Sequence, residues 1–192
     1  MKKIIAVTTI LFTSHTFAEG WGAGIYMEQG SVDQDVAIQE GMGEALQGGG
    51  VSISWQTKAN SIGAFQIQSG IGFVSASDQD RYAVATVDSN DNQGYRTSSV
   101  GGTNWFMEAG YDKQFESNYG AFVNLGYSSY GLNRSISACS DCPTEAVDLS
   151  DANYLHLGGS VKVTPISNIR IGYQHYFSGD IINNLKIQWL IP

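Results

Sequence analysis

The chain has 192 residues, enough for one domain, and carries 18 acidic against 10 basic residues. No basic stripe is present that could neutralise phosphates, which argues against a nucleic-acid partner. No stretch is apolar for the ~20 residues that a membrane-spanning helix needs. Glycine is abundant (23), proline is scarce (3) and aromatic residues are frequent, a mixture that suits strands more than helices.

The first 18 residues have the order of a secretory signal peptide. Lys2 and Lys3 give a positive start, residues 4–12 are mostly apolar, and the segment ends in the small residue Ala18. An ordinary buried N-terminal segment is the alternative. We expect cleavage near Ala18, which leaves residues 19–192 as a single domain. That domain is more acidic still, because it loses both lysines and no acid.

Alternation of apolar and polar residues with period two recurs eight times in the rest of the chain, and this pattern predicts strands with two unlike faces. In the first segment one face reads Trp21, Ala23, Ile25, while glycines lie between them. The start of the fourth strand is open between a position near Thr103 and an earlier one at 82–87. The eight segments are 21–28, 51–56, 65–73, 105–111, 119–127, 155–163, 169–173 and 185–191.

The connections alternate in length, and every long one follows an odd-numbered strand. Short periplasmic turns and longer extracellular loops in this order are typical of transmembrane barrels, in which an even strand number puts both termini on the periplasmic side. The sequence therefore predicts an all-β, eight-stranded, antiparallel up-and-down transmembrane β-barrel. The predicted loops are 30–49, 77–101 and 132–150, the turns are 58–61, 116–118 and 164–168, and the fourth connection, 178–183, is short.

Aromatic residues gather at strand ends on the apolar face, as in the two aromatic girdles of a membrane barrel. The opposite face carries Gly, Ser, Gln, Asn and several charges. A secreted soluble β-protein would turn the same two faces the other way round, so alternation alone leaves that alternative open. The predicted girdle residues are Trp21, Trp55, Phe73, Trp105, Tyr111, Phe115, Tyr119, Tyr127, Tyr173 and Trp189.

The strand count, the loop order and the segment from Gly172 to Gly179 together resemble the small outer-membrane barrels of the opacity-protein, Ail/OmpX and OmpA-transmembrane-domain kind. The resemblance covers the whole mature chain, but no single motif in it is specific. It implies a Gram-negative outer-membrane location and, in some relatives, adhesion or surface protection. The chain departs from the group at its end, because the last aromatic residue, Trp189, lies three residues before Pro192.

Charged residues on the polar face would point into a lumen just wide enough for its side chains to fill. Charges in such a lumen must pair or be hydrated, because an isolated buried charge is very unfavourable. Three acids and three bases would balance, and we expect a structural network that plugs the barrel. A narrow ion path is the alternative. The predicted lumen residues are Glu28, Glu108, Asp112, His156, Lys162, Arg170 and Lys186.

Cys139 and Cys142 lie in the third loop. In an exported protein an even cysteine count indicates a disulfide, and no second Cys pair or His pair completes a zinc site. The segment 88–94 has oxygen ligands at alternate positions but lacks the Gly and Glu of a calcium-binding EF-hand loop. We therefore expect a disulfide, no metal and no cofactor.

His175 is the one candidate for catalysis, by comparison with lipid A deacylases of the outer membrane. Those enzymes place a Ser two residues after a lipid-facing His, whereas position 177 here is Phe and the nearest serine is Ser178. A nucleophile and its base need hydrogen-bond reach, which this spacing does not give. We expect no enzyme, but a monomeric surface barrel that contacts outer-membrane lipid and lipopolysaccharide. Its acidic loops would contact host or cell-surface ligands. The alternatives are a lipid A-modifying hydrolase and a narrow passive pore.

Overall fold

The computed structural model describes residues 20–59, 63–79, 84–87, 93–115, 118–136, 142–164 and 167–191. These residues form strands almost throughout, with one short helix. The elements are β1 (Trp21–Val32), α1 (Gln34–Glu40), β2 (Met42–Gln56), β3 (Ala64–Asp78), β4 (Val84–Val87), β5 (Gln93–Arg96), β6 (Ser98–Gln114), β7 (Tyr119–Ile136), β8 (Glu145–Val147), β9 (Ala152–Thr164), β10 (Ser167–Tyr176) and β11 (Ile181–Ile191).

Eight of these strands form one closed barrel. The order of pairing is β1, β2, β3, β6, β7, β9, β10, β11, and β11 pairs with β1 to close the ring. Every pair is antiparallel and every barrel strand pairs with its neighbour in the chain, apart from the short loop strands. The predicted all-β, eight-stranded, antiparallel up-and-down barrel is confirmed.

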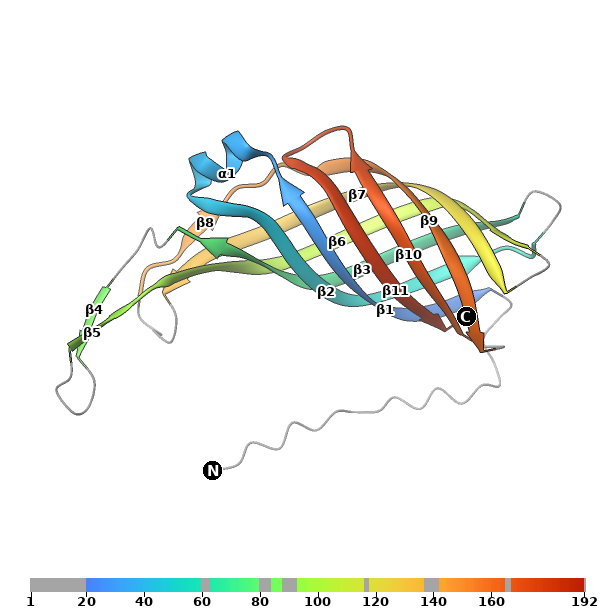
Figure 1. The fold of residues 1–192 in the computed structure, drawn as a ribbon, viewed down its shortest axis with the longest axis horizontal. Helices are drawn as coiled ribbons and strands as arrows, with labels where there is room; N and C mark the ends of the chain where they lie inside the picture. Colours follow the sequence, from blue (N-terminus) through green and yellow to red (C-terminus); the bar gives the residue numbers. More distant parts are fainter. Residues whose placement is uncertain are drawn as a thin grey trace, which may run out of the picture.

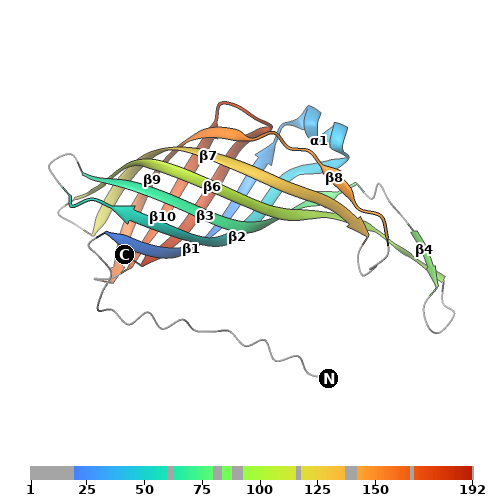
Figure 2. The ribbon, with the colours of Figure 1, turned by 180° about the vertical axis from the view of Figure 1, so that it is seen from behind.

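The two ends of the barrel differ, as Figure 1 shows. The start of β1, the end of β11 and the turns from β2 to β3, from β6 to β7 and from β9 to β10 lie at one end, which we call the terminal end. Helix α1, strand β8 and the hairpin β4–β5 lie at the other, the loop end. Seen from behind, β3, β6 and β7 reach farthest toward the hairpin (Figure 2).

The predicted loops are shorter than expected, because the strands continue into them. The first predicted loop, 30–49, contains the end of β1, all of α1 and the start of β2. Strand β6 begins at Ser98, and the alternative start at 82–87 was wrong, because Val84–Val87 is a separate strand that pairs with β5. These extensions turn apolar residues such as Leu46, Val100 and Leu132 inward and small or polar residues outward, which is the reverse of the eight predicted segments, so the alternation of those segments does not continue into them.

Alternation sorts the side chains of the barrel into two environments. Outward side chains include Ile25 at 56% exposure, Phe73 at 77% and Leu125 at 63%, whereas inward Glu108 and Arg170 are buried. This polarity is the reverse of a soluble barrel and is that of a transmembrane one. No helix among the described residues has the length and hydropathy to span a bilayer.

Candidate functional site

Glu28 of β1 is the centre of the first polar cluster in the lumen. Its carboxylate accepts hydrogen bonds from the side-chain amides of Asn104 and Asn184, the latter at 2.9 Å. Lys186 pairs with Glu28 in the register of β1 and β11, with 3.8 Å between Nζ and Oε2. The ammonium also lies 3.4 Å from the centre of the Phe106 ring, a cation–π contact. Both charges are therefore compensated although both are buried.

Glu108 of β6 is the centre of the second cluster. Its Oε2 lies 3.0 Å from Nδ1 of His156 and accepts a hydrogen bond of 3.2 Å from the Tyr154 hydroxyl. Its Oε1 accepts from the amide of Asn124 at 3.1 Å, and Asn124 in turn accepts from Gln66 at 2.8 Å. His156 is on β9, which is not the neighbour of β6, so this cluster joins strands across the lumen.

Asp112 and Arg170 form the third cluster, nearer the terminal end. The Arg170 guanidinium of β10 donates to the Asp112 carboxylate of β6, and both side chains are buried. The guanidinium also lies 5.2 Å from the centre of the Phe122 ring. Its Nε and Nη1 have no hydrogen-bond partner within the described part of the chain. This pair thus links β10 to β6 through the interior.

Lys162 does not join these clusters, which corrects the predicted list. Its side chain is exposed, because Lys162 lies close to the end of β9 at the terminal end, where the barrel stops. The described lumen bases are Arg170, Lys186 and His156. Three acids therefore face two permanent cations and one histidine, and the interior is neutral when His156 carries a proton.

Inward-facing glycines make room for large rings in the narrow lumen. A Cβ placed on Gly70 would lie 2.5 Å from the Phe106 ring, and one on Gly126 would lie 2.3 Å from the Tyr154 ring. A Cβ this close to another atom is not tolerated without movement. Small residues opposite large ones fill the lumen of an eight-stranded barrel without a channel.

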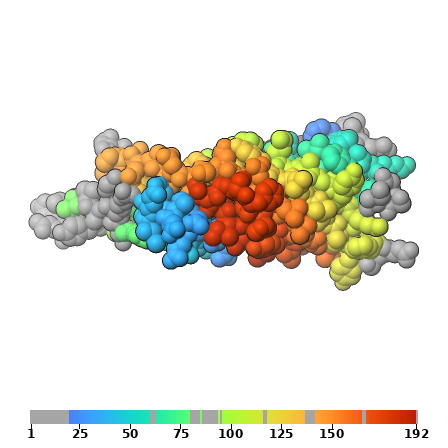
Figure 3. All heavy atoms as spheres, turned by 90° about the horizontal axis from the view of Figure 1, so that it is seen from above, coloured from blue at the N-terminus to red at the C-terminus, as the bar shows by residue number. Residues whose placement is uncertain are grey.

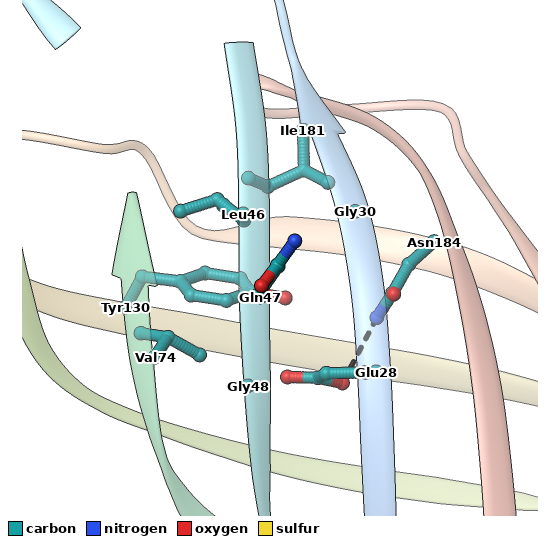
Figure 4. Close-up of a pocket in the computed structure, with 9 residues that line it drawn as sticks. All are labelled: Glu28, Gly30, Leu46, Gln47, Gly48, Val74, Tyr130, Ile181 and Asn184. Atoms are coloured by element: carbon teal, nitrogen blue, oxygen red, sulfur yellow. Dashed lines mark hydrogen bonds between the residues drawn. The ribbon is translucent and has the colours of Figure 1, made fainter. Parts of the chain in front are cut away.

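Above the polar clusters, toward the loop end, the interior is apolar. We call this buried cluster the plug. The small cavity below it, about 10 Å³, is the size of one water molecule. It lies between apolar Leu46 and Ile181 and the polar groups of Glu28, Tyr130 and Asn184 (Figure 4). The plug residues are Val32, Ala37, Met42, Leu46, Val74, Val100, Tyr130, Leu132, Val147, Leu149, Ala152, Tyr154, Tyr176 and Ile181.

Arg134 of β7 fastens the loop end and was not predicted as a site residue. Its buried guanidinium donates to Asp78 at the end of β3, at 3.0 Å, and to Glu145 of β8. It also donates to the carbonyls of Glu40 and Gly41 at the end of α1. Burial acts to lower the pKa of Arg134, but the two carboxylates raise it above its ordinary value. A single cation therefore joins four separate segments.

Further bonds join the loop segments to one another. The backbone N–H of Asp33 donates to the carbonyl of Asp180, whose carboxylate accepts from the N–H of Ser150 at 2.6 Å. The carbonyl of Gly41 accepts from Gln79. Figure 3 shows the α1 region (blue) beside the chain around β8 and β9 (orange) and around β10 and β11 (red). Helix α1, strand β8 and the chain around Ser150 and Asp180 are thus bonded to one another and cover the plug. We call these segments the roof.

The surface of the roof is acidic. Asp35, Glu44, Asp148 and Asp151 are exposed, and the described bases of this end are Arg96 and the buried Arg134. The hydroxyl of Tyr127 donates a hydrogen bond that lowers the pKa of Asp151. Within the described part of the chain no group of three His, Cys, Asp or Glu side chains is placed to hold a metal ion.

The predicted girdle residues all point outward. Trp21, Trp55 and Trp189 lie at the terminal end, and Trp105 packs against Tyr127 with ring centres 5.3 Å apart. Trp55 and Tyr127 are half-buried, and the others are exposed, namely Trp21, Phe73, Trp105, Tyr111, Phe115, Tyr119, Tyr173 and Trp189.

Other predicted features are not assembled into sites. His175 is exposed on the outer face, while the Ser178 hydroxyl accepts from the backbone and side chain of Asn153. Cys139, residues 88–92 and the segment 1–18 lie outside the described residues. The disulfide between Cys139 and Cys142 therefore stays a prediction, and we expect a thiol titration of the native protein to find no free thiol.

The barrel with a charged interior and an apolar exterior defines the class of small eight-stranded membrane barrels. A scan against models of protein families and a search of curated proteins gave no match. Among solved structures, the chain is similar to Ail, the attachment invasion locus protein of Yersinia pestis, in complex with the heparin analogue sucrose octasulfate. The TM-score is 0.51 at 11% identity, over 91% of this chain and 98% of Ail.

A second structure of Ail from Yersinia pestis gives a TM-score of 0.50, again at 11% identity and with the same coverage of both chains. Neisserial surface protein A gives 0.48 at 11% identity, over 89% of this chain and 95% of the other. At such identity the comparison with Ail establishes a shared fold.

Proposed function

We propose that the chain is a non-enzymatic surface barrel of the Gram-negative outer membrane, exported by the segment 1–18. Its terminal end faces the periplasm and its roof faces outside. The observation that carries the proposal is the reversed polarity of the wall, apolar outside and charged inside. The outward aromatic residues support it, because Trp and Tyr favour the membrane–water interface.

The body of the barrel supports envelope integrity as a rigid closed cylinder, and the roof carries the contacts with other surfaces. The buried side chains of the three lumen clusters and of the plug occupy the interior. This filling speaks against the narrow pore, because the cavity beside Glu28 is the size of one water molecule.

The lipid A-modifying hydrolase gains no support from the region of His175. Within the described residues, no carboxylate or hydroxyl is hydrogen bonded to its ring, and the Ser178 hydroxyl bonds to Asn153 on the neighbouring strand. Base-assisted attack by a serine needs the two groups within hydrogen-bond reach.

The charge of the roof restricts its partner. The Ail structure holds a polyanionic sulfated sugar, but the exposed charges of this roof are predominantly acidic. Like charges facing each other across an interface disfavour binding. A surface ligand of this protein is therefore neutral or cationic, and anionic lipopolysaccharide would approach the roof through divalent cations.

Membrane fractionation with a heat-modifiability gel tests the proposal. We expect the protein in the outer-membrane fraction, with a faster band before boiling than after it, because the closed barrel stays compact in detergent. In planar bilayers it should give no steady conductance, and lipid A incubated with it should keep its acyl chains. A soluble protein without a mobility shift would end the proposal, and acyl release would replace it with the hydrolase.

A further inference from the structure

The described charges outside the lumen are separated between the two ends of the barrel. Every described acidic residue outside the lumen lies at the loop end. They are Asp33, Asp35, Glu40, Glu44, Asp78, Glu145, Asp148, Asp151 and Asp180. The exposed lysines lie at the terminal end, one beside each of its three short turns. They are Lys58, Lys113 and Lys162, and we call them the lysine collar.

The collar covers a continuous arc of the barrel wall. The turn that carries Lys58 meets the end of β6 at Gly63, where a Cβ would lie 3.4 Å from Cα of Lys113. The backbone N–H of Lys162 donates to the carbonyl of Asn118 in the turn between β6 and β7. The three lysines are thus carried by adjoining segments, from β2 round to β9.

The collar also lies at the level of the barrel where aromatic residues indicate a membrane–water interface. Lys113 has the outward parity of Tyr111 and follows it by two residues at the end of β6. Phe115 and Tyr119 are exposed and flank the turn between β6 and β7. The backbone N–H of Phe115 donates to the carbonyl of Tyr119 at 2.9 Å. Aromatic side chains of this kind lie at the headgroup level, which places the lysines beside lipid phosphates.

We propose that the lysine collar binds the anionic headgroups of phospholipids in the leaflet that surrounds the terminal end. The proposal rests on the membrane insertion proposed above. A lysine close to an anionic lipid surface favours binding by about fivefold. The acidic roof repels the same headgroups, so the protein prefers anionic lipid at one end only. This preference fixes its orientation and recruits an anionic annulus.

Quenching of tryptophan fluorescence by brominated lipid measures the preference, since Trp21, Trp55 and Trp189 lie at the terminal end. The full protein is folded into phosphatidylcholine vesicles that contain a minor share of phosphatidylglycerol, with bromine on one lipid or the other. We expect phosphatidylglycerol to be enriched around the protein by about three- to tenfold at low salt, and less at high salt.

The combined variant Lys58→Gln, Lys113→Gln, Lys162→Gln should lose the enrichment, and the corresponding lysine-to-arginine variant should keep it. The matched control is Asp35→Asn, Glu44→Gln, Asp148→Asn, which changes as many charges at the loop end and should not lower the enrichment. Quenching by each lipid in proportion to its mole fraction in the wild type would overturn the collar proposal while leaving the membrane barrel intact. Failure to fold in every vesicle would instead contradict the proposed function.

Discussion

Replacing Arg134 by methionine is expected to open the roof while leaving the barrel closed. Methionine keeps much of the volume but removes every bond of the guanidinium, so the carboxylate of Asp78, almost fully buried, loses its counter-ion. Breaking one side of a buried ion pair costs about 3–5 kcal/mol. The end of α1 loses its contacts at the same time, because the carbonyls of Glu40 and Gly41 have Arg134 as a donor.

Hydrogen exchange of the folded protein measures this effect. Amides of α1 and β8 should exchange roughly 100-fold faster or more, whereas those of the barrel strands and the gel mobility should not change. Arg134→Lys should recover little, because an ammonium cannot reach the same acceptors with the geometry of a guanidinium. Adding Asp78→Asn to Arg134→Met should recover part of the protection.

The exposed base Lys58 offers the matched control, since Lys58→Met removes a cation from the other end of the barrel. Unchanged exchange in α1 of Arg134→Met would show that the plug alone holds the roof. A loss of gel mobility in the same variant would show that the roof and the barrel fold as one unit.

The sequence sufficed for the barrel because period two assigns each side chain to one of two faces. Eight segments with the correct parity, in an order of short and long connections, leave little choice of topology. The parity also placed Glu28, Glu108, Asp112, His156, Arg170 and Lys186 inside. It was wrong for Lys162, because parity loses its meaning where the wall ends and both faces meet water.

Parity cannot tell which lumen side chains meet. Glu28 and Lys186 face each other on adjacent strands, and once the barrel is closed their pairing follows from the register. Glu108 and His156 come from β6 and β9, which β7 separates, so their contact depends on how the strands tilt and stagger around the barrel. Alternation along a single strand carries no information on that stagger.

The roof has a weaker signal in the sequence, at the boundaries of α1. Asp33 caps α1 by accepting from the N–H of Asp35, and Gly41 ends it in the left-handed conformation, with φ of 64°. Asp before and Gly after a short apolar stretch is a known pattern for helix boundaries. Arg134 had no such signal, because its partners come from three segments, and those of Asp78 and Glu40 lie 56 and 94 residues away in the chain.

Glu108→Gln is expected to lower the stability of the barrel more than the loss of any exposed acid. The amide nearly matches the carboxylate in shape, so the effect comes from charge, and His156, Arg170 and Lys186 are left facing two acids. Removing one partner of a buried, hydrogen-bonded charge costs about 3–5 kcal/mol. Glu108→Ala should be worse, because it adds a cavity and leaves Asn124 and Tyr154 without their acceptor.

Urea unfolding in vesicles, followed by tryptophan fluorescence and gel mobility, measures the loss. Glu44→Gln removes an exposed acid from the roof and should stay within about 0.5 kcal/mol of the wild type. The double variant Glu108→Gln, His156→Gln separates pairing from simple burial. If His156 balances Glu108, the double variant should be more stable than the sum of the two single losses predicts. Strict additivity would show instead that Glu108 is compensated by Arg170 and Lys186, so that a neutral His156 serves only as a hydrogen-bond partner.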